Sequence, residues 1–172
     1  MGIKNLTEAE EKDFYRLVEK MNGKEPDKKQ DAKVKKPQYG DTVYYINYIG
    51  RIRKRTWIND EDDLGMWKLG NIFFTEESAE FAREKRKVKV ELQRYALEHN
   101  DPEKEAWDLK NRHFGLMLKH DTKDIEQTDL RIFQDESVTC FTSAPIARDA
   151  IEAVGKDRIL KYIFNVDCEG MK

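Results

Sequence analysis

Four consecutive acidic residues, Asp60 to Asp63, form the densest group of side chains in this sequence that could take part in catalysis. Carboxylates bind divalent cations, and acids that hold Mg²⁺ are the usual centre of a metal-dependent nuclease. The run lacks the alternating ligands and the closing glutamate of an EF-hand loop. Consecutive acids also alternate faces or lie in loops instead of converging on one metal. We therefore interpret the run as a solvated acidic loop, and a nuclease is the less favoured alternative.

The other candidates for catalysis are two cysteines and three histidines. Cys140 lies in an apolar stretch, which is typical of a small core residue and not of a nucleophile. Cys140 and Cys168 are too few for a disulfide framework, so we expect reduced thiols. His113 and His120 bracket a predicted strand and point to opposite faces of it, so they do not share a metal. The sequence predicts no catalytic residue, no metal and no cofactor, and a protein that is not an enzyme.

Arginines occupy every second position from Arg51 to Arg55, and tyrosines lie in the preceding segment 42–49, and this pattern favours binding. The segments 42–49 and 51–58 flank Gly50 and are rich in strand-forming types, which predicts a hairpin. The predicted partner-binding residues are Tyr44, Tyr48, Arg51, Arg53, Arg55 and Trp57. Such a surface suits a protein interface, and it also suits single-stranded nucleic acid held by charge and stacking. The alternative is a polar outward face without any partner.

A second basic tract, Arg83 to Lys89, lies in the longest predicted helix, where Glu76, Glu77 and Glu80 precede it and Glu84 lies within it. Glutamate paired with lysine or arginine four positions later stabilises an exposed helix by about 0.2–0.5 kcal/mol per pair. We therefore interpret this tract as a solvated helix face.

The pattern of elements over residues 39–166 predicts a single α+β domain. After the first hairpin we expect a short extended piece around residues 66–69, a helix over 76–98 and a short helical turn within 102–112. Three strands should follow, over 113–120, 125–133 and 138–141. The last elements are a helix from Ser143 to Gly155 and a second amphipathic piece over 156–164. Helix starts are indicated by capping residues and by Pro145 in a first turn. Hairpins followed by helices predict a mainly antiparallel sheet that helices cover on one face.

A weak internal echo suggests two hairpin-plus-helix units side by side. Phe74-Thr75 is followed by Ala79 and Ala82, and Phe141-Thr142 is followed by Ala147 and Ala150. In both places a strand leads into a helix whose small residues allow close packing. Two unrelated strand-to-helix junctions are the alternative explanation.

Residues 1–38 differ from the rest in pattern. A capping box at Thr7 and Glu10 precedes an amphipathic helix over residues 8–22, within an N-terminal segment 1–22. Its apolar stripe consists of Phe14, Leu17, Val18 and Met21. We expect this stripe to dock on the domain, on a second copy in a homodimer, or on a partner. The six lysines and three acids of residues 23–38 indicate a charged flexible linker. We expect residues 167–172 to form a frayed tail.

The overall composition excludes several classes of protein. Thirty-two Lys and Arg against 34 Asp and Glu leave a net charge of −2, which excludes a uniformly basic nucleic-acid coat and a polyacidic DNA mimic. No stretch approaches the about 20 apolar residues of a membrane helix, and the first residues lack the hydrophobic core of a signal peptide. We expect no membrane partner and a cytoplasmic location.

Several segments resemble one family of phage-encoded proteins. They are Tyr39 to Ile46, Gly50 to Trp57, Gly70 to Thr75, Ala79 to Val88, Glu91 to Ala96, and Cys140 to Phe164. The family comprises uncharacterised proteins of phages and prophages of low-GC Gram-positive bacteria, and the match covers about residues 39–166. The resemblance implies a phage accessory protein in the bacterial cytoplasm. Such proteins often bind and disable a host factor, including CRISPR effectors, so it implies a host or phage protein as the partner, with direct nucleic-acid binding as the alternative.

Overall fold

The computed structural model describes residues 7, 35–130, 132 and 134–166. The chain divides into two units between Lys36 and Pro37. The predicted helix over 8–22 with its stripe of Phe14, Leu17, Val18 and Met21 lies outside the described residues, as do most of the predicted linker and the tail.

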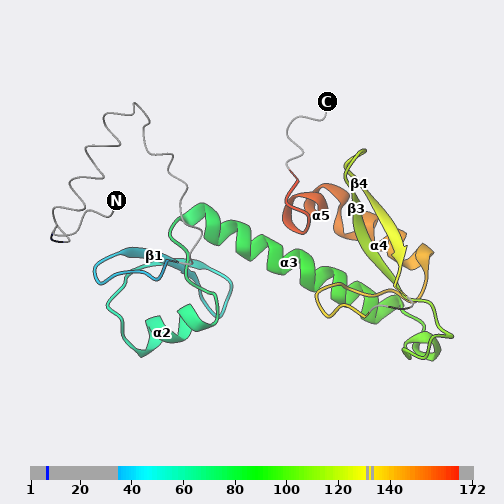
Figure 1. Ribbon diagram of the computed structural model, residues 1–172, viewed down its shortest axis with the longest axis horizontal. Helices are drawn as coiled ribbons and strands as arrows, with labels where there is room; N and C mark the ends of the chain where they lie inside the picture. Colours follow the sequence, from blue (N-terminus) through cyan, green and yellow to red (C-terminus); the bar gives the residue numbers. More distant parts are fainter. Residues whose placement is uncertain (1–6, 8–34, 131, 133, 167–172) are drawn as a thin grey trace, which may run out of the picture. The chain divides into compact units, whose positions relative to one another are not determined.

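The second unit contains two hairpins and four helices, which confirms the predicted α+β class (Figure 1). The elements are β1 (Thr42–Ile46), β2 (Ile52–Thr56), α2 (Glu61–Lys68), α3 (Glu76–His99), the 3-10 turn η1 (Pro102–Lys104), β3 (Phe114–Lys119), β4 (Asp124–Asp129), α4 (Ala144–Val154) and α5 (Lys156–Tyr162). The strands form two separate antiparallel sheets of two strands each, not one continuous sheet.

The first hairpin pairs β1 with β2 in a register that runs from Thr42 opposite Thr56 to Ile46 opposite Ile52. A short extended segment then returns to the free edge of β1, where Tyr44 and Phe73 exchange two backbone hydrogen bonds of 2.8 and 2.9 Å. The helix α3 begins three residues after Phe73.

The second hairpin repeats this arrangement. The strands β3 and β4 pair from Phe114 opposite Asp129 to Lys119 opposite Asp124. Phe114 and Phe141 exchange two backbone hydrogen bonds of 2.8 Å, and α4 begins shortly after Phe141.

The two junctions correspond residue by residue. Phe73 corresponds to Phe141, and the capping residue Thr75 of α3 corresponds to Ser143 of α4. Ala79 and Ala147, four residues after each cap, are both fully buried. The predicted pair of hairpin-plus-helix units is therefore present, with an equivalence that is shifted by one residue, since the sequence echo matched Phe74 to Phe141.

The helix α2 is the main correction to the predicted elements. Residues 59–63 were expected to be a loop and residues 66–69 an extended piece, but Glu61–Lys68 are helical. Asp60 caps this helix by accepting the N–H of Asp63 at 2.8 Å. Acidic side chains in a first turn interact favourably with the helix dipole, so an acidic run marks a helix start as well as it marks a loop.

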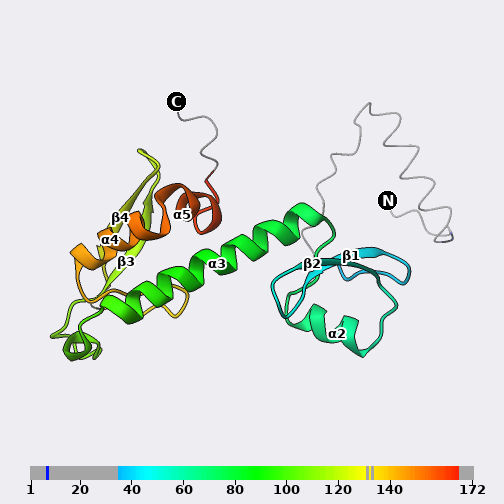
Figure 2. The ribbon, with the colours of Figure 1, turned by 180° about the vertical axis from the view of Figure 1, so that it is seen from behind.

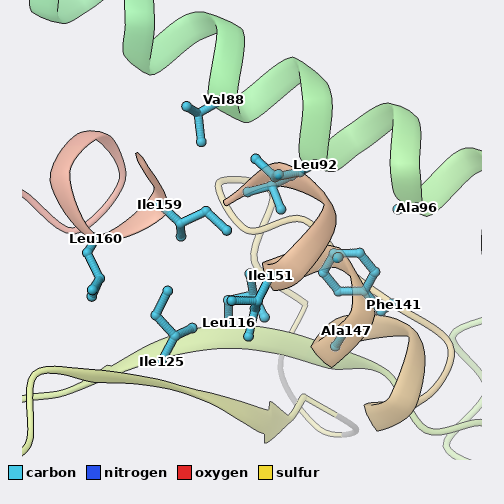
Figure 3. Close-up of a cluster of buried hydrophobic side chains, with 12 residues drawn as sticks. Val88, Leu92, Ala96, Leu116, Ile125, Phe141, Ala147, Ile151, Ile159 and Leu160 are labelled. Atoms are coloured by element: carbon cyan, nitrogen blue, oxygen red, sulfur yellow. The ribbon is translucent and has the colours of Figure 1, made fainter. Parts of the chain in front are cut away.

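Two hydrophobic clusters hold the unit together. The smaller cluster contains Val43, Trp57 and Ile72, with side chains of α2 packed against it, and so α2 covers one face of the first hairpin (Figure 2). The larger cluster joins α3, α4 and α5 to the second hairpin, with buried side chains such as Leu92 and Ile151 at its centre (Figure 3).

Candidate binding surface

Arg55, one of the predicted partner-binding arginines, is engaged within the fold. Its Nε lies 2.9 Å from Oδ1 of Asp63, and its Nη2 lies 2.9 Å from Oδ2 of Asp60. The Arg55 side chain is only 25% exposed. It therefore joins β2 to the start of α2 and is not free to neutralise an external anion.

The acidic run has a structural role in its most buried member. The side chain of Asp63 is fully buried, and its Oδ2 accepts the backbone N–H groups of Ile58 and Asn59 at 2.8 and 2.9 Å. Glu61 and Asp62 are exposed. In the part of the chain that the structure describes, no group of three or more His, Cys, Asp or Glu residues is placed to hold a metal ion.

Trp57 was predicted to bind a partner, but the structure does not place it at the surface. The side chain of Trp57 is 1% exposed and belongs to the core beneath the first hairpin. Trp57 directly follows β2 and packs with Val43 and Ile72 on the side where α2 contributes side chains, so the tryptophan points inward. Tyr44 is half-buried and its backbone is bridged to Phe73.

The remaining predicted residues lie at the exposed end of the first hairpin. Tyr48, in the turn between the strands, is 97% exposed, and its neighbour Ile49 is 54% exposed. Arg51 and Arg53 are exposed as well. We call residues 48–53 the hairpin tip. It keeps one tyrosine and two arginines of the predicted set, while Arg55 and Trp57 are internal.

A groove of about 330 Å³ lies beside the hairpin tip, and the sequence reasoning missed it. Its lining combines two residues of the first hairpin with one face of α3: Ile46, Gly50, Arg83, Arg86, Lys87, Val90, Glu91 and Arg94. We call it the basic groove, because four of these residues are cations and one is an acid. Residues three and four apart share one helix face, so the cations follow the groove in a row.

Two glutamates neutralise part of this charge. Glu84 accepts hydrogen bonds from Lys87 at 2.9 Å and from Arg83 at 3.0 Å, and chiefly the Lys87 contact lowers the pKa of Glu84. Glu91 is bound at both oxygens by Arg158, at 2.6 and 2.9 Å, and this contact lowers the pKa of Glu91. Both carboxylates thus stay ionised and paired near neutral pH.

Two arginines in the groove keep their charge available. Arg86 donates one hydrogen bond of 3.3 Å to the side-chain oxygen of Asn71, which is uncharged. Arg94 makes no ion pair with any of the described residues. The groove is therefore suited to an anionic group that the described residues do not supply.

The sequence pattern indicates only one of the two walls of the basic groove. Arg83, Lys87 and Arg94 recur at helical spacing, which places them on one face of the long helix. The other wall, Ile46 and Gly50, comes from more than 30 residues earlier in the chain. No local pattern shows that this turn lies beside that face.

Cys140 was expected to be a small core residue in a strand over 138–141, but it lies outside the named strands and outside the buried core. It is half-buried, and burial raises the pKa of the Cys140 thiol. A thiol with a raised pKa stays protonated at neutral pH and is a poor nucleophile.

Among the described residues, none of the helices is both long and apolar enough to cross a bilayer.

Comparisons with known proteins add no assignment. No protein-family model matches this chain, and neither a curated protein nor a solved structure is similar to it. Any assignment of function therefore has to start from the geometry of the described residues.

Proposed function

We propose that this chain is a binding protein without a catalytic role, which attaches to an acidic surface of another macromolecule. One observation carries this proposal: the nearly fully exposed Tyr48 belongs to a turn that contributes to the lining of a groove with Arg86 and Arg94. Tyr48 lies in the turn between Ile46 and Gly50, and both of these residues line the groove.

A protein is the partner that the exposed side chains favour. Tyrosine and arginine are enriched among the residues that dominate binding energy at protein interfaces. Exposed large hydrophobic side chains are concentrated between residues 39 and 74: Tyr39, Tyr48, Ile49, Ile58, Leu69 and Phe74. Apolar anchors beside a row of cations suit an acidic protein surface, because charge complementarity speeds association and selects the partner.

The resemblance to phage-encoded proteins suggests the setting for this binding. In that setting the chain is an accessory protein in the cytoplasm of a bacterial host, where it inhibits or redirects a host factor. An anti-defence role, such as inhibition of a CRISPR nuclease, is one form of this proposal.

Direct binding of single-stranded nucleic acid is the second candidate, and the row of cations in the groove supports it. Phosphate contacts by lysine and arginine weaken steeply as salt rises, because bound counterions are released. Tyr48 would stack on a base in this arrangement.

The test is an affinity pull-down with the tagged full-length protein from the lysate of a Gram-positive host, with and without nuclease. We expect one stoichiometric protein that survives nuclease treatment. Two variants, Tyr48→Ala and Arg86→Glu/Arg94→Glu, should lose it. The matched control is Lys110→Glu/Lys123→Glu, which makes the same charge change at exposed lysines away from the groove.

Each other result has a defined meaning. If the tagged protein retains nucleic acid and no protein, and if this nucleic acid is lost at high salt and with the Arg86→Glu/Arg94→Glu variant, the result supports the second candidate. Retention of the partner by both groove and tip variants would assign binding to another surface. If the tagged protein retains neither protein nor nucleic acid from the lysate of a Gram-positive host, the proposal is contradicted.

A further inference from the structure

Among the described residues, one edge of β3 is unpaired over most of its length. The neighbour of β3 on one side is β4, while on the other side only Phe114 is paired, with Phe141. In an antiparallel ladder, the N–H and C=O groups of every second residue point to the same side. The backbone groups of Leu116 and Leu118 therefore point the same way as those of Phe114, away from β4. Within the described residues, these groups have no hydrogen-bond partner.

The first hairpin shows how the same edge is closed. Ile46 lies two residues after the bridged Tyr44, as Leu116 lies two residues after the bridged Phe114. The side chain of Asn71 accepts the N–H of Ile46 at 3.3 Å and donates to its C=O at 2.8 Å. An asparagine amide presents one acceptor and one donor, so Asn71 replaces the missing strand partner.

The second hairpin lacks this closure. Asn71 lies two residues before the bridged Phe73, and the corresponding residue before Phe141 is Thr139. Thr139 has no amide group, and its side chain makes no hydrogen bond with any described residue. The two related units thus differ at this position: the edge of β1 is sealed and the edge of β3 is not.

A cavity of about 360 Å³ lies beside the open edge. Its lining residues are Lys85, Lys89, Leu92, Leu116, Ser137, Val138, Thr139, Ile159, Ile163 and Phe164. Leu92, Leu116 and Ile159 belong to the buried core that Figure 3 shows, so the floor of the cavity is apolar. The volume lies within the range of about 300–1,000 Å³ that is typical of small-ligand pockets.

Two lysines line the cavity and favour an occupant that carries negative charge. Lys85 and Lys89 are one helical turn apart on α3 and make no ion pair within the described part of the chain. The carboxylate of Asp135 interacts electrostatically with Lys89. The pKa of Asp135 is lowered, chiefly by hydrogen bonds from Ser137. One acid against two lysines leaves a net positive charge for an anionic group.

We propose that the open edge of β3 binds an extended peptide segment of another protein by strand addition. The peptide pairs with the backbone of Leu116 and Leu118, places an aliphatic side chain in the cavity, and carries an acidic residue toward Lys85 and Lys89. This site is separate from the basic groove, since the two have no lining residue in common. It does not depend on the proposed function. The unpaired backbone groups favour a peptide over a small amphipathic anion, which fills the cavity but offers no strand to pair with.

The edge itself is tested without a ligand, by amide hydrogen exchange of the full-length protein measured by NMR. We expect the amides of Leu116 and Leu118 to exchange much faster than those of Gly115 and Met117, which pair with β4. The variant Thr139→Asn copies Asn71 and should slow exchange at Leu116. Equal protection of all four amides in the unmodified protein would show that the edge is already covered, and it would overturn the proposal.

The occupant is tested by selecting random nonapeptides, displayed on phage, against the immobilised full-length protein. Selected sequences should combine aliphatic and acidic residues, and their synthetic forms should protect the Leu116 and Leu118 amides. Lys85→Glu/Lys89→Glu and Thr139→Asn should each weaken binding by about tenfold, which corresponds to about 1.4 kcal/mol. Arg86→Glu/Arg94→Glu makes the same charge change on another part of α3 and should leave affinity within about twofold.

Three results would overturn the proposal. The first is a selection that yields no binder. The second is a bound peptide that leaves the Leu116 and Leu118 amides in fast exchange or ignores Thr139→Asn. The third is binding of decanoate in the cavity while peptides do not bind, which would assign the site to a small amphipathic anion.

Discussion

Arg55 Nε lies 2.9 Å from Oδ1 of Asp63, and the aspartate side chain is fully buried. The other oxygen of Asp63 accepts the N–H groups of Ile58 and Asn59, which lead from β2 into α2. One carboxylate therefore satisfies a cation and two backbone donors at the same time. Within the acidic run, Asp63 acts through these contacts and Asp60 through the cap of α2 and its own contact with Arg55.

Replacing Asp63 should destabilise the fold strongly. Asp63→Ala leaves both backbone donors without their acceptor and Arg55 with Asp60 alone, and breaking such a buried pair costs about 3–5 kcal/mol. Asp63→Asn keeps one acceptor and should cost less. Asp62→Ala removes an exposed neighbour and should change the free energy of unfolding by less than about 0.5 kcal/mol. Urea denaturation measures all three, and equal stability of the two alanine variants would contradict the structural role of Asp63.

Asn100 should also be important for stability. Its side chain donates to the C=O of Cys140 at 3.1 Å and accepts the N–H of Thr142 at 3.0 Å, which ties the end of α3 to the segment before α4. Asn100→Ala leaves both backbone groups unpaired and should cost about 1–3 kcal/mol. Asn100→Asp keeps the acceptor alone and should fall between. Gln93→Ala, at an exposed position of α3, is the control, and an Asn100→Ala variant as stable as this control would refute the assignment.

Gly115 should resist replacement because its surroundings are full. A Cβ atom at this position would lie 2.8 Å from Cδ1 of Leu130 and 2.8 Å from Cγ1 of Val138. Overpacking of this kind costs about 1–3 kcal/mol, so Gly115→Ala should lower the thermal midpoint. Adding Val138→Ala removes one of the two clashes, so the double variant should be more stable than the sum of the single effects predicts. Strict additivity in calorimetry would show that the two positions do not touch.

The Glu91–Arg158 contact should give a small, pH-dependent contribution to stability. Because Arg158 lowers the pKa of Glu91 below its ordinary value of 4.5, the folded state favours the ionised carboxyl. Its contribution is therefore present above the unfolded-state pKa and is lost as pH falls through the folded-state pKa. The Glu91 side chain is 39% exposed, so solvent limits the contribution to less than about 1 kcal/mol.

Glu91→Gln tests this linkage. The variant should be less stable than the unmodified protein at neutral pH, and the difference should vanish below the folded-state pKa of Glu91. Glu98→Gln, an exposed change on the same helix, should show no such pH dependence. Urea denaturation at a series of pH values compares the three proteins. A constant difference across that series would exclude the ion pair as its cause.

Several elements were predictable because their signals are local. Thr75 and Ser143 cap α3 and α4 through hydrogen bonds to residues three positions ahead, and Gly155 ends α4 with a positive φ of 98°. Each signal needs only a few neighbouring residues, so the sequence shows it directly. The start of α2 at Asp60 is local as well, but an acidic run is compatible with a loop and with a capped helix, and the wrong alternative was chosen.

The sequence by itself determined the α+β class, the boundaries of the long helices and the pairing within each hairpin, since caps, turns and periodicity act over short distances. Only the tertiary structure decided which side of the first hairpin is covered, and thereby placed Trp57 in the core and Arg55 against Asp63. It also decided that the turn of that hairpin lies beside Arg86 and Arg94. The physical reason is that strand alternation defines two faces but does not tell which face a distant element will bury.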